Sequence, residues 1–179
     1  MVDQARHEQF VQSLRDWGCV FMLAVWLQSI MASGIAKNGS RDGGRSKYLK
    51  TRNNLMKKEI GAVWTEFKRE FPGEITAQEE LAAHMIILIR NQLAHCLISS
   101  GKGLALFLPK ERRQERIKRL ISAGWIGVPD DAAFDPAMLV LREGDREWFD
   151  RNTSMILNFA DNTVLRLTRG HGIEDLAIC

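Results

Sequence analysis

The stretch LAAHMIILIRNQLAH, residues 81–95, decides which kind of fold this chain can form. Most of its residues are apolar, and their spacing predicts a helix with one face packed against a core. Arg90, Asn91 and His95 interrupt this apolar pattern. Burying a guanidinium is costly unless the group is paired or used. The stretch therefore predicts a core helix that carries either a charge partner or a functional site.

Helical patterns continue on the N-terminal side of this stretch. Residues 4–36 and 48–71 carry apolar side chains at helical spacing, and each segment predicts one helix. Thr76 and Glu79 have the spacing of a capping box, in which the Thr and Glu side chains bond each other's backbone N–H groups. The helix that holds the opening stretch is therefore expected to run from 77 to about 99.

The C-terminal part of the chain predicts a small insert and one more long helix. Residues 103–109 and 137–144 are short β-like runs, and residues 110–124 favour a short basic helix. A last helix is expected over 146–170. The predicted fold class is all-α: a bundle of four to five helices, in a single domain over 1–179, with a small extended or two-stranded insert before the last helix.

Composition indicates an intracellular protein. The chain has 179 residues, a net charge of +3 and three widely spaced cysteines without a CxxC pair. That cysteine pattern is typical of a reducing compartment. The start of the chain lacks the basic-then-apolar pattern of a signal peptide. The longest apolar run, CVFMLAVWL at 19–27, is well short of the roughly 20 residues that span a bilayer. We therefore expect a cytoplasmic protein with no membrane partner.

Positive charge is concentrated in two segments. Residues 41–69 contain nine Lys and Arg against three acidic residues, and a second basic run, PKERRQERIKR, occupies 109–119. Such runs are often solvated helix faces, but two of them on a small domain also suit a surface that binds a polyanion. The basic residues that follow the opening stretch are candidate RNA-binding residues: Lys102, Lys110, Arg112 and Arg113.

The polar residues of the opening stretch divide between two sides of a regular helix. Asn91 and His95 lie about one turn apart on one side, whereas Arg90 points about 140° away from His95. Two copies of the helix related by a two-fold axis would let the Arg of one chain meet the His of the other. The spacing therefore predicts a homodimer with a shared site.

These residue types suit phosphoryl chemistry on RNA. A histidine that titrates near neutrality serves as a general base or acid, and arginine is a bidentate clamp for phosphate. No carboxylate pair, metal-ligand cluster or phosphate-binding loop accompanies them in the sequence. The candidate catalytic residues are Arg90, Asn91 and His95, with no metal ion and no cofactor. Attack of an RNA 2′-hydroxyl on its own phosphate, with arginine stabilising the developing charge, fits this set.

The motif RNQLAH on a core helix, followed by a short extended insert and a final long helix, resembles the HEPN superfamily. The resemblance implies a helical bundle that dimerises through the motif helices. It also implies a metal-independent ribonuclease site built by both protomers, as in toxins, phage-defence proteins and CRISPR effectors. Carried over to this chain, Arg90 would bind the scissile phosphate, His95 would transfer protons and Asn91 would orient them.

The sequence also departs from some HEPN patterns. Leu97 stands where HEPN toxins neutralised by a nucleotidyltransferase carry Tyr, which argues against that mode of control, and Cys96 stands where many members carry Gly. An antitoxin or another regulatory partner is a further expectation. Some HEPN domains are non-catalytic modules that bind a nucleotide or a partner protein, and this alternative stays open.

Two other interpretations compete with the ribonuclease. His95 could be a core histidine bonded to a backbone carbonyl, and Arg90 could form an interface ion pair with Asp161 or Glu174. The segment RRQERIKRLISAGWIG, followed by AMLVLREG, also resembles the helix and wing of a DNA-binding regulator. That fold needs another helix closely upstream, where the β-like run GLALFLP lies, and it therefore ranks lowest.

Overall fold

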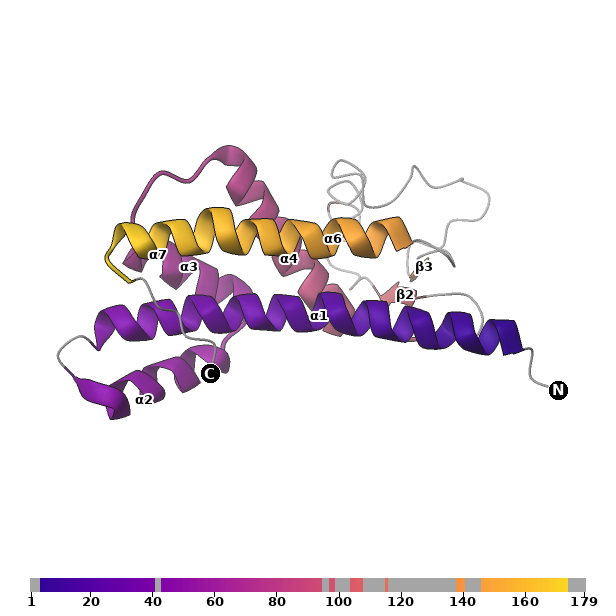
Figure 1. Cartoon of the computed structure of the whole chain (residues 1–179), viewed down its shortest axis with the longest axis horizontal. Coiled ribbons are helices and arrows are strands. Elements are labelled where there is room, and N and C mark those ends of the chain that lie inside the picture. Colours follow the sequence, from indigo (N-terminus) through magenta and orange to yellow (C-terminus); the bar gives the residue numbers. More distant parts are fainter. Residues whose placement is uncertain are drawn as a thin grey trace. The chain divides into compact units, whose positions relative to one another are not determined.

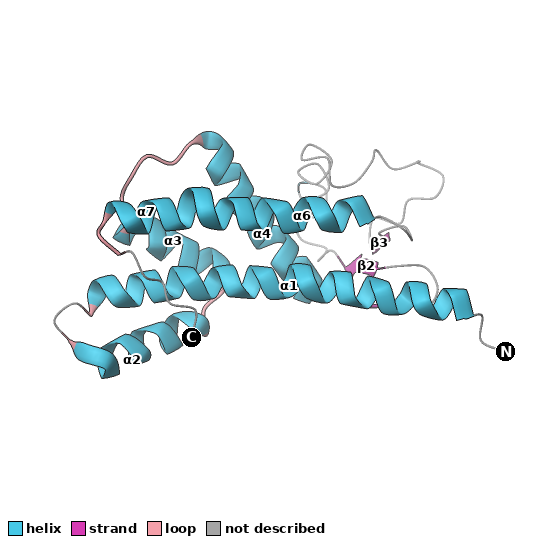
Figure 2. Ribbon diagram, viewed as in Figure 1, coloured by secondary structure: helices cyan, strands magenta, loops and turns pink. Residues whose placement is uncertain are grey.

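A computed structural model describes residues 4–40, 43–94, 97–98, 104–107, 115, 138–140 and 146–173. These residues are mainly helical, as Figures 1 and 2 show, and the predicted all-α bundle is confirmed. The elements in chain order are α1 (Gln4–Gly39), α2 (Gly44–Met56), α3 (Ile60–Glu70), α4 (Ala77–Ala94), β1 (Leu97–Ile98), β2 (Leu104–Phe107), β3 (Met138–Val140), α6 (Arg146–Phe159), the π-helical turn η1 (Ala160–Leu165) and α7 (Arg166–Gly170).

The chain divides into two compact units. The first comprises Met1–Phe21 and Leu88–Asn152, and the second comprises Met22–Ile87 and Thr153–Cys179. Each of the helices α1, α4 and α6 contributes residues to both units. The expected single domain over 1–179 stays a prediction.

The segment predicted as one helix over 48–71 forms two helices, and that prediction is wrong. α2 ends at Met56 and α3 begins at Ile60. In one continuous helix, Leu55 would point about 130° away from the middle of the apolar stripe of α3. The break between the helices lets both Leu55 and Ile60 be buried, at 3% and 1% exposure. Burial of both apolar faces outweighs the hydrogen bonds that a continuous helix would add.

Helix α4 starts as predicted and ends earlier than predicted. The Thr76 hydroxyl accepts a hydrogen bond from the Glu79 N–H at 3.2 Å, and the Glu79 carboxylate accepts one from the Thr76 N–H at 2.7 Å, which confirms the capping box. The helix ends at Ala94, and a strand begins at Leu97. Its expected extension to residue 99 is therefore wrong, because 97–98 pair with β2 instead.

The described residues of the insert form three short strands, whereas the sequence predicted two. They form an antiparallel sheet in the order β1-β2-β3, with Leu97 opposite Ala105 and Leu106 opposite Leu139. β2 occupies the place where a winged-helix domain would need a helix, and this disfavours the DNA-binding interpretation. The basic helix predicted over 110–124 lies outside the described residues except for Glu115, which is helical.

The core of the second unit is aromatic. Trp64 and Phe67 of α3 are almost fully buried, and Trp64 meets Phe159 of α6 edge-on with ring centroids 5.4 Å apart. A Cβ atom on Gly34 of α1 would approach the Thr168 Cγ2 to 3.2 Å, so glycine permits the close packing of α1 against α7. These contacts fix how α3 and α7 pack against the parts of α6 and α1 that belong to the second unit.

Helix α1 contains one candidate membrane span by length and composition, and the expected cytoplasmic location stays a prediction. Leu14–Gly39 is long and apolar enough to cross a membrane by length and composition alone, with a mean hydropathy of 1.8. The nine-residue apolar run in the sequence did not reveal it, because isolated polar residues such as Gln28 interrupt the pattern. About 61% of the window is buried within the protein, and core helices of soluble proteins meet the same criterion.

Glu79 connects the start of α4 to the C-terminal helices of the second unit. Beside the capping bonds, its carboxylate accepts hydrogen bonds from the Thr163 hydroxyl at 2.9 Å and the Arg166 guanidinium at 2.8 Å. Burial alone would raise the pKa of Glu79. The hydrogen bonds from the Thr76 backbone, Arg166 and Thr163 outweigh that effect and lower the pKa from 4.5 to about 2.

This pKa predicts acid sensitivity that depends on Glu79. Because the folded-state pKa lies below the unfolded value, the stabilisation is complete above pH 4.5 and is lost as the pH falls towards 2. We expect Glu79→Gln to lower the free energy of unfolding at pH 7 by on the order of 3 kcal/mol and to flatten its decline between these pH values. Chemical denaturation across pH measures both effects.

The matched control is Glu59→Gln, at an exposed N-cap position whose side chain makes no capping bond. It should change the free energy of unfolding by less than about 0.5 kcal/mol. Equal effects of the two substitutions would contradict a special role for Glu79.

Candidate functional site

Arg90 and Asn91 lie in the last two turns of α4, in the part of the helix that belongs to the first unit. The apolar side chains on either side of them, Ile89 and Leu93, are 2% and 1% exposed. These buried residues hold the end of the helix in place. Arg90 and Asn91 are themselves half-buried, so they remain within reach of a ligand on a firmly packed element.

The Arg90 guanidinium has no charge partner in the described part of the chain. Its Nη1 donates a hydrogen bond to the Asn91 Oδ1 at 3.3 Å, which brings together two of the three predicted catalytic residues. Its Nε is enclosed, and none of the described residues offers it an acceptor. Among those residues no carboxylate forms an ion pair with Arg90, Asp161 included, and Glu174 lies outside them. Within the described residues this guanidinium is therefore not compensated by a carboxylate.

The other predicted site residues lie outside the described residues: His95, Lys102, Lys110, Arg112 and Arg113. In the sequence, His95 directly follows Ala94, the last residue of α4. The expected angular relation between Asn91 and His95 therefore stays a prediction. The roles of all five residues stay predictions.

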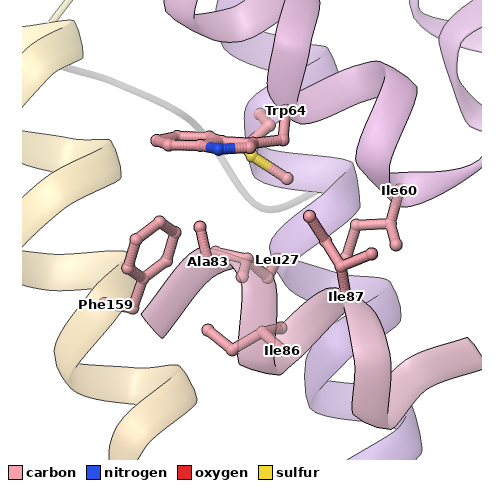
Figure 3. A pocket seen from close by; sticks show the side chains of 8 residues that line it. Leu27, Ile60, Trp64, Ala83, Ile86, Ile87 and Phe159 are labelled. Carbon is pink, nitrogen blue, oxygen red and sulfur yellow. The ribbon is translucent and has the colours of Figure 1, made fainter. Parts of the chain in front are cut away.

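A small cavity in the second unit is not a ligand site. Figure 3 shows its lining of apolar and aromatic side chains, and its volume is about 10 Å³. That volume is about the space of one water molecule, and apolar cavities of this kind stay dry. The lining residues are Leu27, Met31, Ile60, Trp64, Ala83, Ile86, Ile87 and Phe159. The cavity is a minor packing defect of the core.

Charged side chains on α3 and α4 form a surface network. The Glu80 carboxylate lies 2.8 Å from the Lys68 Nζ and 3.3 Å from the exposed His84 Nε2. Burial acts to raise the pKa of Glu80, but the hydrogen bond and charge of Lys68 lower it overall. His84 lies on the exposed surface of α4. No cluster of three or more His, Cys, Asp or Glu residues suited to a metal ion occurs within the ranges that the structure describes.

Sequence inspection missed a second half-buried guanidinium that lacks a carboxylate partner among the described residues. Arg52 of α2 donates from Nε to the Ser33 Oγ at 3.1 Å and from Nη2 to the Ser29 Oγ at 2.8 Å. The two serines lie four residues apart in α1, and hence on one side of that helix. The sequence signal for this contact was the four-residue spacing of the two serines, together with the basic segment at 41–69 that follows them in the chain.

Comparisons of the chain with models of protein families, with curated proteins and with solved structures find no match. The function of the site is therefore inferred from its own residues and geometry.

We expect substitutions of Arg90 and Arg52 to have opposite effects on the free energy of unfolding. Arg90→Met removes a half-buried charge whose Nε has no acceptor among the described residues, and it keeps most of the side-chain volume. We expect the free energy of unfolding to stay unchanged or to rise by about 1 kcal/mol. Arg52→Met breaks two hydrogen bonds and leaves the buried Ser33 hydroxyl without its donor, which should cost about 1–3 kcal/mol. Urea denaturation of the two variants compares them directly. A larger loss in Arg90→Met than in Arg52→Met would mean that Arg90 has a stabilising partner.

Proposed function

We propose that this protein is a HEPN-type, metal-independent endoribonuclease that cleaves single-stranded RNA at a site completed by a second copy of the chain. The observation that carries the proposal is the half-buried side chain of Arg90. Its Nη1 is bonded to Asn91, its Nε is enclosed without an acceptor, and it has no carboxylate partner among the described residues. An RNA phosphate would offset the cost of that unpaired charge.

The reaction assigns one task to each residue. His95 removes the proton from a ribose 2′-hydroxyl, and the 2′-oxygen attacks the adjacent phosphorus. Arg90 stabilises the additional negative charge on the phosphoryl oxygens, and Asn91 holds the guanidinium in position. The bond from phosphorus to the 5′-oxygen then breaks, and that oxygen takes up the proton that His95 removed from the 2′-hydroxyl. The products are a 2′,3′-cyclic phosphate and a 5′-hydroxyl.

The proposal includes a cytoplasmic location and a role as a toxin or phage-defence protein, with an antitoxin or another regulator as its partner. RNA would extend from the site along Lys102, Lys110, Arg112 and Arg113. The unpaired Arg90 also suits a nucleotide phosphate, so a non-catalytic nucleotide-binding module is the second candidate. Cleavage distinguishes the two functions, because a binding module would hold the ligand unchanged.

Cleavage of RNA is the first test. Purified protein with single-stranded RNA in EDTA should release products with 2′,3′-cyclic phosphate ends, detected by gel analysis and mass spectrometry. We expect Arg90→Ala to reduce the rate by about 10²–10³-fold and His95→Ala by about 10²–10⁴-fold. Arg15→Ala, which removes an exposed arginine of the first unit, should retain full activity. A wild-type protein that binds nucleotides and leaves varied RNA substrates intact would support the binding module instead.

The shared site is tested by mixing two inactive variants. A dimer of one Arg90→Ala chain and one His95→Ala chain keeps an intact arginine on one copy and an intact histidine on the other. We expect the mixture to recover cleavage that neither variant shows alone. Light scattering should give twice the chain mass of 20.4 kDa. A monomer at micromolar concentration, or no recovery on mixing, would contradict the shared site.

A further inference from the structure

Helix α2 forms a strongly basic surface in the second unit. Residues 44–58 contain six Lys and Arg and no acidic residue. Of these, Lys58 pairs with Glu66. The exposed Arg45, Lys47, Lys50 and Lys57 form no ion pair with any described residue. Within the part of the chain that the structure describes, no carboxylate therefore neutralises these four side chains.

Part of this charge is arranged in a line. Lys47, Lys50, Asn54 and Lys57 follow one another at helical spacings of three, four and three residues, and all four are exposed. We call these four residues the basic stripe. It extends along about 15 Å of helix. Leu55, which is 3% exposed, points about 140° away from Lys50 and anchors the opposite side of the helix. The stripe thus faces solvent on a helix whose other side is packed.

The stripe is held on a fixed support. Figure 1 shows α2 running back beside the end of α1, and both segments belong to the second unit. Arg52 is bonded to Ser29 and Ser33 of α1. The Gln28 Nε2 donates a hydrogen bond to the Lys58 carbonyl oxygen at 2.9 Å and secures the end of α2. Because the partners of Arg52 are neutral hydroxyls, this arginine anchors the helix and also keeps its full positive charge.

We propose that the basic stripe binds the phosphate backbone of single-stranded RNA. This inference rests on the proposed function, since it assigns a second contact for the same class of substrate. Exposed lysines along a helix neutralise consecutive phosphates, and Asn53 and Asn54 add amide groups that hydrogen-bond sugar or phosphate oxygens. An anionic membrane surface fits less well, because a helix that lies on lipid presents a broad apolar face to it. On α2 the only large apolar side chain that is clearly exposed is Leu49, at 41%.

Binding is measured on the full chain with RNA that cannot be cleaved. A fluorescent single-stranded oligonucleotide with 2′-O-methyl groups lacks the attacking hydroxyl, and its anisotropy gives the dissociation constant over a range of salt concentrations. The triple variant Lys47→Gln, Lys50→Gln, Lys57→Gln should weaken binding at 0.1 M salt by about 10–100-fold. It should also reduce the magnitude of the slope of log K against log salt by about 2.

A matched triple variant removes the same charge elsewhere. Arg15→Gln, Arg151→Gln and Arg169→Gln neutralise three exposed arginines that lie outside α2, and this protein should bind RNA within about threefold of wild type. Circular dichroism melts of both triple variants should match wild type, since all six side chains are exposed. Equal losses in both variants, or an unchanged affinity and slope in the stripe variant, would overturn the proposal.

Vesicles that contain phosphatidylserine test whether the stripe binds an anionic membrane surface instead of RNA. Loss of vesicle binding in the stripe variant, with RNA binding retained, would assign the stripe to a membrane and overturn the proposal.

Cleavage of ordinary RNA is scored separately. If the stripe variant binds uncleavable RNA like wild type while wild type cleaves RNA, the stripe proposal alone fails. If wild type does not cleave and the stripe still governs binding, the ribonuclease proposal alone fails.

Discussion

The placement of the start of α4 depends on the hydrogen bonds that the Glu79 carboxylate accepts. It closes the capping box with Thr76 and accepts bonds from Thr163 and Arg166, so one side chain joins the first turn of α4 to η1 and α7. The same helix carries Arg90 and Asn91 near its other end. The charged hydrogen-bond network therefore fixes the part of α4 that belongs to the second unit.

Two arginines share an unusual property, because neither Arg90 nor Arg52 has a carboxylate partner in the part of the chain that the structure describes. Their surroundings explain how each is tolerated. Arg52 is held by two serine hydroxyls, and Arg90 is bonded to a single neighbouring amide while its Nε is enclosed without an acceptor. Neutral partners satisfy donors without cancelling charge. Arg90 carries the first proposal as an anion-binding group, and Arg52 supports the second by anchoring the helix that bears the basic stripe.

Local sequence patterns were sufficient to predict much of the helical framework. The Thr76–Glu79 spacing predicted the start of α4, and the apolar period predicted α1. Predictions were wrong where residues distant in the chain decide the outcome. α4 stops early because Leu97 and Ile98 pair with β2, and the expected helix over 48–71 is broken because Leu55 and Ile60 both reach the core. The π-helical turn η1, within which Thr163 bonds Glu79, had no recognised sequence signal.

For the candidate site, the sequence by itself determined the residue types and their order: an arginine and an asparagine side by side in an apolar helix, and a basic segment from residue 41 onwards. Composition and spacing are local properties, so they can be read without a fold. Only the tertiary structure decided that the Nε of Arg90 is enclosed without an acceptor, that Arg52 rests on Ser29 and Ser33, and that three lysines of the basic segment form an exposed stripe. These properties depend on which side chains from other helices surround each charge, and packing alone brings such side chains together.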